Sequence, residues 1–146
     1  MFNFFKNKIK KEKNKNNDLL KKTACLLIHA AKIDDNYTKR EKKIIRKSLI
    51  KLGVKSDEVD KIMITAEKEE ENSTHILNFT KEIKNTNKDF KILIVRTLWE
   101  IIYSNKEADM YETNLMRRLS GLLYLDSKVV GDIKQKVIKK NNDIFG

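Results

Sequence analysis

Proline is absent from the sequence, glycine occurs only 4 times and cysteine once in 146 residues. A chain so poor in the residues that make tight turns does not suit a turn-rich sheet and favours helices joined by short loops. The length suits one hydrophobic core but is short for two. We therefore expect an all-α fold, a single-domain bundle of about seven helices.

The chain also lacks any run of about 18 uninterrupted apolar residues, so no membrane-spanning helix is expected. Its start has no signal-peptide core, and the lone Cys25 lies in an apolar run where it suits a reducing compartment. We expect a cytoplasmic protein. No Ser-His-Asp order, Gly-rich phosphate loop or Cys-His pair stands out, so we expect no enzymatic activity.

Positive charge is concentrated at the start of the chain. The formal net charge is +11, and more than half of that excess lies in the first 22 residues. The opening MFNFFKNKIKK mixes phenylalanine and isoleucine with lysine, which suits an anionic membrane surface, although a flexible or partly packed tail is an equally simple interpretation. We therefore expect a flexible basic tail (residues 1–17), a helical domain (18–140) and a C-terminal tail (141–146), with residues 1–15 as the candidate for peripheral membrane contact.

A second basic group lies on the helix expected from about Thr38 to Leu52. Such charge is what phosphate binding needs, but no aromatic residue interleaves it and Glu41 interrupts it, so a solvated helix face is the commoner explanation. We do not expect nucleic acid as a partner. The group consists of Lys39, Arg40, Lys42, Lys43, Arg46, Lys47 and Lys51.

Apolar residues recur at helical spacing along the rest of the chain. One helix is expected to end near Ile33, the next to stop at Gly53, and a segment from Phe90 to Tyr103, apolar almost all round, to form the central helix with Trp99 in the core. Further helix starts are expected at Ser56, at Asp109, and at Asp126 or Ser127.

Two of these helix-loop-helix junctions can be laid over each other. AAKIDDNYTKREKKIIRKSLIKL, from Ala30, matches IIYSNKEADMYETNLMRRLSGLL, from Ile101, at a constant offset. The match has low identity and indicates an internal duplication. The paired positions include Asp34 with Asn105, Asn36 with Glu107, Thr38 with Asp109, and Glu41 with Glu112.

The two junctions resemble the TerB-like tellurite-resistance proteins. In that family a hydrophobic helix ends in Ala-Asp-Gly, an acidic residue and an aliphatic, and Asp/Ser-x-x-Glu opens the next helix. The copies here are KIDDNYTKRE and YSNKEADMYE, while THILNFTKEI and LLYLDSKVVGDIKQKV resemble the middle segment and the closing helix. Asp35 and Lys106 stand where the family has glycine, and Asn105 where it has aspartate.

The resemblance covers residues 19 to 140. It implies an all-helical bundle with no established catalytic activity, linked to resistance to tellurite and other stresses, often near the membrane with partner proteins. It also implies that acidic loop residues bind a divalent cation.

The acidic residues of the junctions have two interpretations. Thr38-x-x-Glu41 and Asp109-x-x-Glu112 have the spacing of a capping box, in which the Glu side chain reaches back to the start of its helix. Alternatively, the junctions bring carboxylates together into the all-oxygen shell that Ca²⁺, Mg²⁺ or Mn²⁺ prefers. Both can hold at once. The candidate metal ligands are Asp34, Asp35, Glu41, Glu107, Asp109 and Glu112.

We therefore expect a non-enzymatic, stress-associated protein that binds a divalent cation at its junctions. The alternative is an adaptor that docks on a membrane surface or an unidentified protein partner through its basic tail and helix faces. In that case the acidic residues serve only as helix caps.

Overall fold

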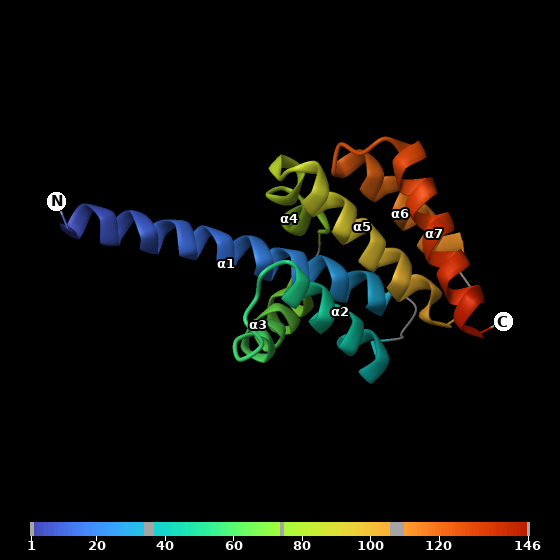
Figure 1. Ribbon diagram of the computed structural model, residues 1–146, viewed down its shortest axis with the longest axis horizontal. Coiled ribbons are helices and arrows are strands. Elements are labelled where there is room, and N and C mark those ends of the chain that lie inside the picture. The colour runs from blue at the N-terminus through green and yellow to red at the C-terminus, as the bar shows by residue number, and fades with distance from the viewer. Residues whose placement is uncertain (1, 34–36, 74, 106–109, 146) are drawn as a thin grey trace.

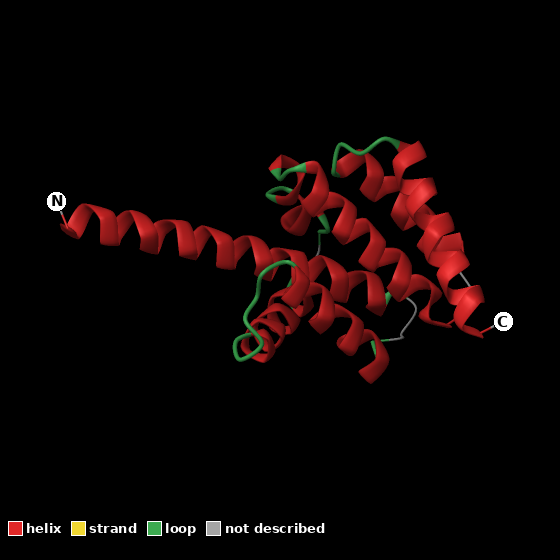
Figure 2. Ribbon diagram, viewed as in Figure 1, coloured by secondary structure: helices red, strands yellow, loops and turns green. Residues whose placement is uncertain are grey.

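The computed structural model describes the backbone of residues 2–33, 37–73, 75–105 and 110–145, and the side chains of 16–33, 37–73, 75–104 and 114–142. Within these residues the chain is an all-α bundle of seven α-helices with two 3-10 turns and no strand (Figures 1 and 2). The elements are α1 (Phe2–Lys32), α2 (Lys39–Lys51), α3 (Val59–Glu71), α4 (Leu77–Thr80), η1 (Ile83–Asn85), α5 (Lys88–Ile102), η2 (Tyr103–Asn105), α6 (Met110–Leu122) and α7 (Ser127–Phe145). The all-α fold predicted from the sequence is confirmed.

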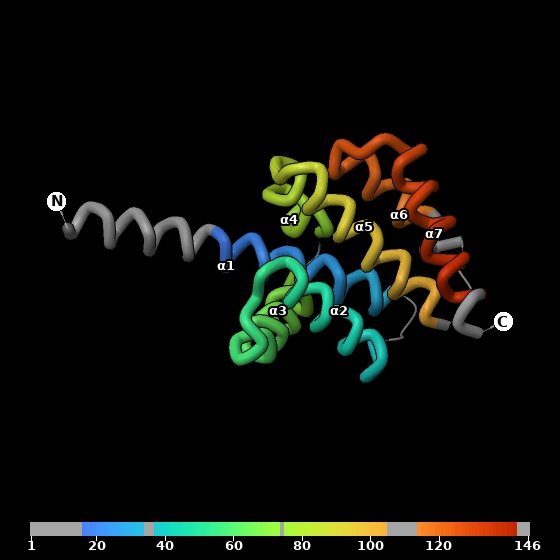
Figure 3. Tube along the Cα trace, in the orientation of Figure 1, coloured from blue at the N-terminus to red at the C-terminus, as the bar shows by residue number. Residues whose placement is uncertain are grey.

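Two helices share the centre of the bundle. Six consecutive residues of α1, Thr23 to Ile28, have no exposed surface, which marks that stretch as a core helix. α5, predicted as the central helix, buries Ile94 and Leu98 completely. It packs against α1 and α2 on one side and against α7 on the other (Figure 3). Trp99 is a core residue as predicted, since it is buried and its Nε1 donates a hydrogen bond of 3.1 Å to the Val130 carbonyl.

Small side chains allow α1 and α3 to approach closely. Ala24 and Cys25 on α1 and Ala66 on α3 are all fully buried, and the Cys25 thiol lies 3.5 Å from the Ala66 carbonyl oxygen. Cys25 is thus the small buried hydrophobe that its apolar neighbours predict. The pairing places the acidic end of α3 beside α1, which matters for the charged contacts described below.

Two helix starts differ from expectation. α1 begins at Phe2, within the segment expected to be a flexible basic tail, which includes no proline or glycine that would end a helix. α3 begins at Val59 after Glu58, so Ser56 is not its N-cap. The predicted cap at Asp126 is confirmed, since its Oδ1 accepts from the Lys128 amide at 3.1 Å. The division into tail and domain stays a prediction.

The sequence duplication extends to the bounds of the helices. α2 and α6 both have 13 residues, and each bound of α6 lies at the same offset from that of α2, from 39 to 110 and from 51 to 122. This offset is the one that aligns the two sequence segments. Each copy therefore consists of a helix, a junction and a second helix, and this second helix has the same length in both copies.

The ends of α2 and α6 also match in hydrogen bonding. The amides of Gly53 and Val54 donate to carbonyls of the last turn of α2, at 3.0 Å each. Those of Tyr124 and Leu125 do the same on α6, at 3.2 and 2.9 Å. Gly53 and Tyr124 have φ of 113° and 56°, so both helices end in the left-handed residue of a Schellman motif. The tyrosine hides this second stop from sequence analysis, because glycine is the residue expected there.

Candidate functional site at the helix junctions

Of the six candidate metal ligands, Glu41 is the one whose side chain the structure describes. Glu112 lies in α6, but its side chain is outside the described part, and Asp34, Asp35, Glu107 and Asp109 lie outside the described residues. Among the side chains that are described, no group of three or more His, Cys, Asp or Glu could hold a metal ion. The cation site therefore stays a prediction.

Glu41 forms the capping box predicted for the first junction. Thr38 is the N-cap of α2, with extended backbone, and its amide donates to Glu41 Oε2 at 3.0 Å. The Thr38 hydroxyl also donates to Oε2. These bonds satisfy one of the free amides at the helix start and fix the direction in which the chain enters α2.

The same carboxylate joins the two junctions. Glu41 is only 1% exposed, and its Oε1 accepts a hydrogen bond of 2.8 Å from the Ser104 hydroxyl, just after α5. Its neighbour Arg40 donates from Nη1 to the Ser104 carbonyl at 2.9 Å. We call these contacts among Arg40, Glu41 and Ser104 the junction contact. It brings the start of α2 beside the end of α5, so the segments that overlay in sequence also meet in space.

The junction contact keeps the Glu41 carboxylate ionised. Burial alone raises the pKa of this carboxyl, but the hydrogen bonds from the Thr38 and Ser104 side chains outweigh that effect and lower the pKa below its ordinary value of 4.5. A carboxylate oxygen can accept about two bonds. Oε2 already accepts two and Oε1 one, so most of the acceptor capacity of Glu41 is used by the protein itself.

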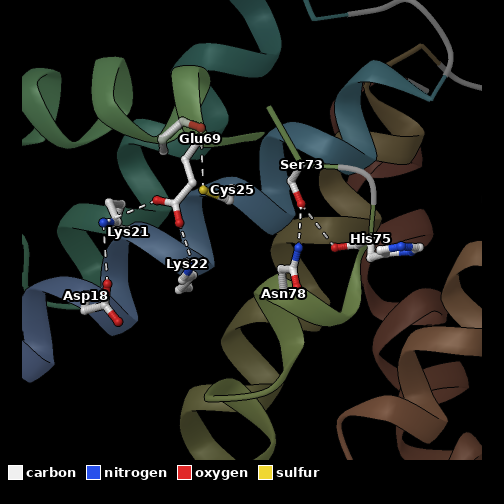
Figure 4. A network of polar contacts seen from close by, with 9 residues as sticks. Asp18, Lys21, Lys22, Cys25, Glu69, Ser73, His75 and Asn78 are labelled. Atoms are coloured by element: carbon white, nitrogen blue, oxygen red, sulfur yellow. Dashed lines mark hydrogen bonds and ion pairs between the residues drawn. The ribbon is translucent and has the colours of Figure 1, made fainter. Parts of the chain in front are cut away.

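A second charged network links the acidic end of α3 to α1, and sequence analysis did not predict it. Glu69 forms ion pairs with Lys22 and, at 3.3 Å, with Lys21, which also pairs with Asp18 at 3.5 Å (Figure 4). The Glu69 contact is the main cause that raises the pKa of Lys22. Burial raises the pKa of the Glu69 carboxyl, yet the two lysines lower it on balance.

Glu70 is the most buried acid of this network. Its oxygens lie 2.6 Å from Lys32 Nζ and 3.3 Å from His29 Nδ1, and the residue is 7% exposed. The sequence holds a signal for it: Glu70 continues the apolar stripe of Val59, Met63 and Ala66 on α3 at helical spacing. An acid on an inner stripe needs a cation from the neighbouring helix.

Glu67 extends the network to the first junction. The Tyr37 hydroxyl donates to Glu67 Oε1 at 2.6 Å, and Lys42 Nζ lies 3.7 Å from the same oxygen. Burial, followed by this hydrogen bond, raises the pKa of Tyr37. Glu67, Glu69 and Glu70 thus help to hold α3 against α1 and α2. They do not form a separate acidic surface.

The fold is a helical bundle in which two duplicated helix junctions meet at a buried carboxylate. A family model, tellurite resistance protein TerB, matches residues 20–135. Because this match covers most of the chain, the protein belongs to the TerB family. Comparison with curated proteins and with solved structures found no match. None of the described helices is both long and apolar enough to cross a membrane.

Proposed function

We propose that this TerB-family protein is a non-enzymatic, stress-associated binding protein that holds a divalent cation at its two helix junctions. The observation that carries the proposal is the hydrogen bond from Ser104 to Glu41, because it ties the two acidic junctions together. The donors are carboxylates, which suit Ca²⁺, Mg²⁺ or Mn²⁺ better than softer metals. Glu41 Oε1 would supply one ligand, and the remaining ligands would come from the other five acids.

The test is thermal unfolding of chelator-treated protein with Ca²⁺, Mg²⁺ or Mn²⁺ added singly. A cation at about 100 times its Kd stabilises the folded state by about 2.7 kcal/mol, which raises the midpoint by roughly 5–10 °C in a domain of this size. Asp34→Asn and Glu112→Gln should abolish the rise. Asp57→Asn is the matched control, because Asp57 is an exposed acid at the opposite end of α2. If no cation raises the wild-type midpoint, the proposal is wrong.

Terbium luminescence gives a direct second measurement. Tb³⁺ binds oxygen ligands as Ca²⁺ does, and a nearby tyrosine can sensitise its emission. Tyr37 and Tyr103, both partly buried, flank the two junctions. We expect sensitised emission that excess Ca²⁺ displaces and that Asp34→Asn removes, while Asp57→Asn retains it.

The second candidate is an adaptor in which the acids serve only as caps. It is favoured by the hydrogen bonds that Glu41 already makes, since they account for its burial without a metal ion. The adaptor would dock on a partner protein or on an anionic membrane through its basic tail and helix faces. Liposome flotation that is unchanged after deletion of residues 1–15 would argue against the membrane version, and Asp34→Asn should leave partner binding intact.

A further inference from the structure

A charged groove with an apolar floor runs between α2 and α3. Its volume is about 710 Å³, and α2 and α3 pack directly against each other beneath it. From Lys39 to Ile50 the α2 side is roughly 17 Å long, or about three helical turns. The groove is long enough to receive one short helix.

The α2 side of the groove is basic apart from Ile50. Lys39, Lys43 and Lys47 are exposed and stand four residues apart on one face, and none pairs with an acid among the described side chains. Like charges at this spacing destabilise a helix. A stripe that costs stability and pairs with no acid in the described part of the chain is suited to an external acidic partner.

The floor of the groove is aliphatic. Ile50 on α2 is 42% exposed and Ile64 on α3 is 57% exposed, and the buried Met63 also lines the groove. These two isoleucines are half of the four large hydrophobic residues that are well exposed in the described part of the chain. Both line the groove, so it offers a binding partner aliphatic contact as well as charge.

The far rim, on α3, is neutralised. Asp60 pairs with Arg46 at 2.7 Å, and Glu67 pairs with Lys42 at 3.7 Å. The groove therefore offers free positive charge on the α2 side, aliphatic contact in the middle and no free positive charge on the α3 side. A helix with an aliphatic stripe and acidic residues along one edge of that stripe complements all three.

We propose that the α2–α3 groove binds an acidic amphipathic helix of a partner protein. A nucleic acid fits less well, because no aromatic residue lines the groove to stack on its bases. A flat membrane follows the shape of a groove between two helices less well than a helix does. A second copy of this chain would bring two molecules of charge +11 together. The groove shares no residue with the cation site, so the two proposals stand or fall separately.

The test is fluorescence anisotropy of a labelled synthetic peptide titrated with the full-length protein. The peptide is a helix of about four turns with leucine at i, i+3, i+4 and i+7 spacing and glutamate along one edge. The double variant Lys43→Glu/Lys47→Glu and, separately, Ile64→Ser should each weaken binding by roughly tenfold or more. A peptide with lysine in place of glutamate should not bind.

Two matched controls should leave binding unchanged. Lys136→Glu/Lys140→Glu on α7 makes the same charge change at the same spacing, also on exposed residues. Leu77→Ser removes a side chain that is 51% exposed on α4, outside the groove. Circular dichroism checks that every variant is folded.

Several results would overturn the proposal. They are absence of binding to the acidic peptide, equal losses in the control variants, or an Ile64→Ser variant that binds as the wild type does. Preferential binding of a short duplex DNA, or of phosphatidylserine vesicles, that is lost in Lys43→Glu/Lys47→Glu but kept in Ile64→Ser would assign the basic stripe to phosphate instead.

Discussion

Gly53 and Tyr124 occupy the same position in the two halves of the protein, each directly after the last turn of a 13-residue helix and each with a positive φ. Both copies therefore have the same backbone conformation at this position, although only the first has glycine, the residue that adopts it most easily. The Tyr124 ring lies 5.8 Å from the ammonium groups of Lys84 and Lys91. These cation–π contacts offset part of the cost of a left-handed tyrosine.

Two identical substitutions should act in opposite directions. Gly53→Ala places a Cβ on a residue with φ of 113°, and we expect it to lower the free energy of unfolding by about 1–2 kcal/mol. Gly121→Ala, in the last turn of α6, should raise it by up to about 1 kcal/mol, because alanine is the better helix former. An added Cβ meets nothing within 4 Å at either site, so the backbone alone decides the sign. Urea unfolding measures both, and equal signs would contradict this account.

The junction contact should contribute to stability beyond helix capping. Ser104→Ala removes one hydrogen bond to a carboxylate and should cost about 1–2 kcal/mol, and Glu41→Gln, which weakens three, about 1.5–3 kcal/mol. The double variant should cost less than the sum of the two, because both remove the same bond. Glu58→Gln, on an exposed acid without a cap hydrogen bond, should change stability by less than about 0.5 kcal/mol. If the losses of unfolding free energy in Ser104→Ala and Glu41→Gln simply add in the double variant, the two residues are not energetically coupled.

The free energy of unfolding should fall in acid because folding lowers the pKa of two carboxyl groups. The pKa values of the Glu41 and Glu69 carboxyls are lowered in the folded protein, so the unfolded chain binds their protons more readily. Their stabilisation is present above the ordinary value of 4.5 and is lost as the pH falls through the lower folded values. Urea unfolding across this range should show a shallower pH dependence in Glu41→Gln/Glu69→Gln. Glu58→Gln should keep the wild-type slope, and an unchanged slope in the double variant would refute the assignment.

The buried thiol should report on unfolding. Burial raises the pKa of Cys25 to about 12, and no part of the residue is exposed. We expect iodoacetamide at about pH 8 to modify the native protein far more slowly than the urea-unfolded chain, because thiolate and access are both lacking. Leu26→Ala should speed the reaction by destabilising the core by about 2–5 kcal/mol. Rapid alkylation of the folded wild type would contradict the packing of α1 against α3.

Local patterns predicted most of the fold, and long-range contacts were the part that they could not supply. The end of α1, the capping box of Thr38 and Glu41 and the cap at Asp126 each follow from neighbouring residues. Ser104 gave no such signal, because its partner Glu41 is 63 positions away and a serine after a helix is unremarkable by itself.

Two further features were missed for physical reasons that differ. α1 extends through the lysine- and asparagine-rich segment, where the sequence pattern indicated no helix start although nothing in the segment ends a helix. Glu70 was given no role from the sequence, although its position on the apolar stripe of α3 indicates burial. The remaining metal candidates stay predictions from the sequence.

The pairing of the α3 acids with α1 and the first junction also affects how the protein meets other molecules. Since Glu67, Glu69 and Glu70 are held by Tyr37 and by basic residues of α1 and α2, the stripe of Lys39, Lys43 and Lys47 is left to dominate the field beside it. An acidic molecule would be turned toward this face before contact, over about 8–10 Å at physiological salt. The rate of association would then depend on the lysines and fall with salt, whereas the lifetime of the complex would depend on the isoleucines beneath them.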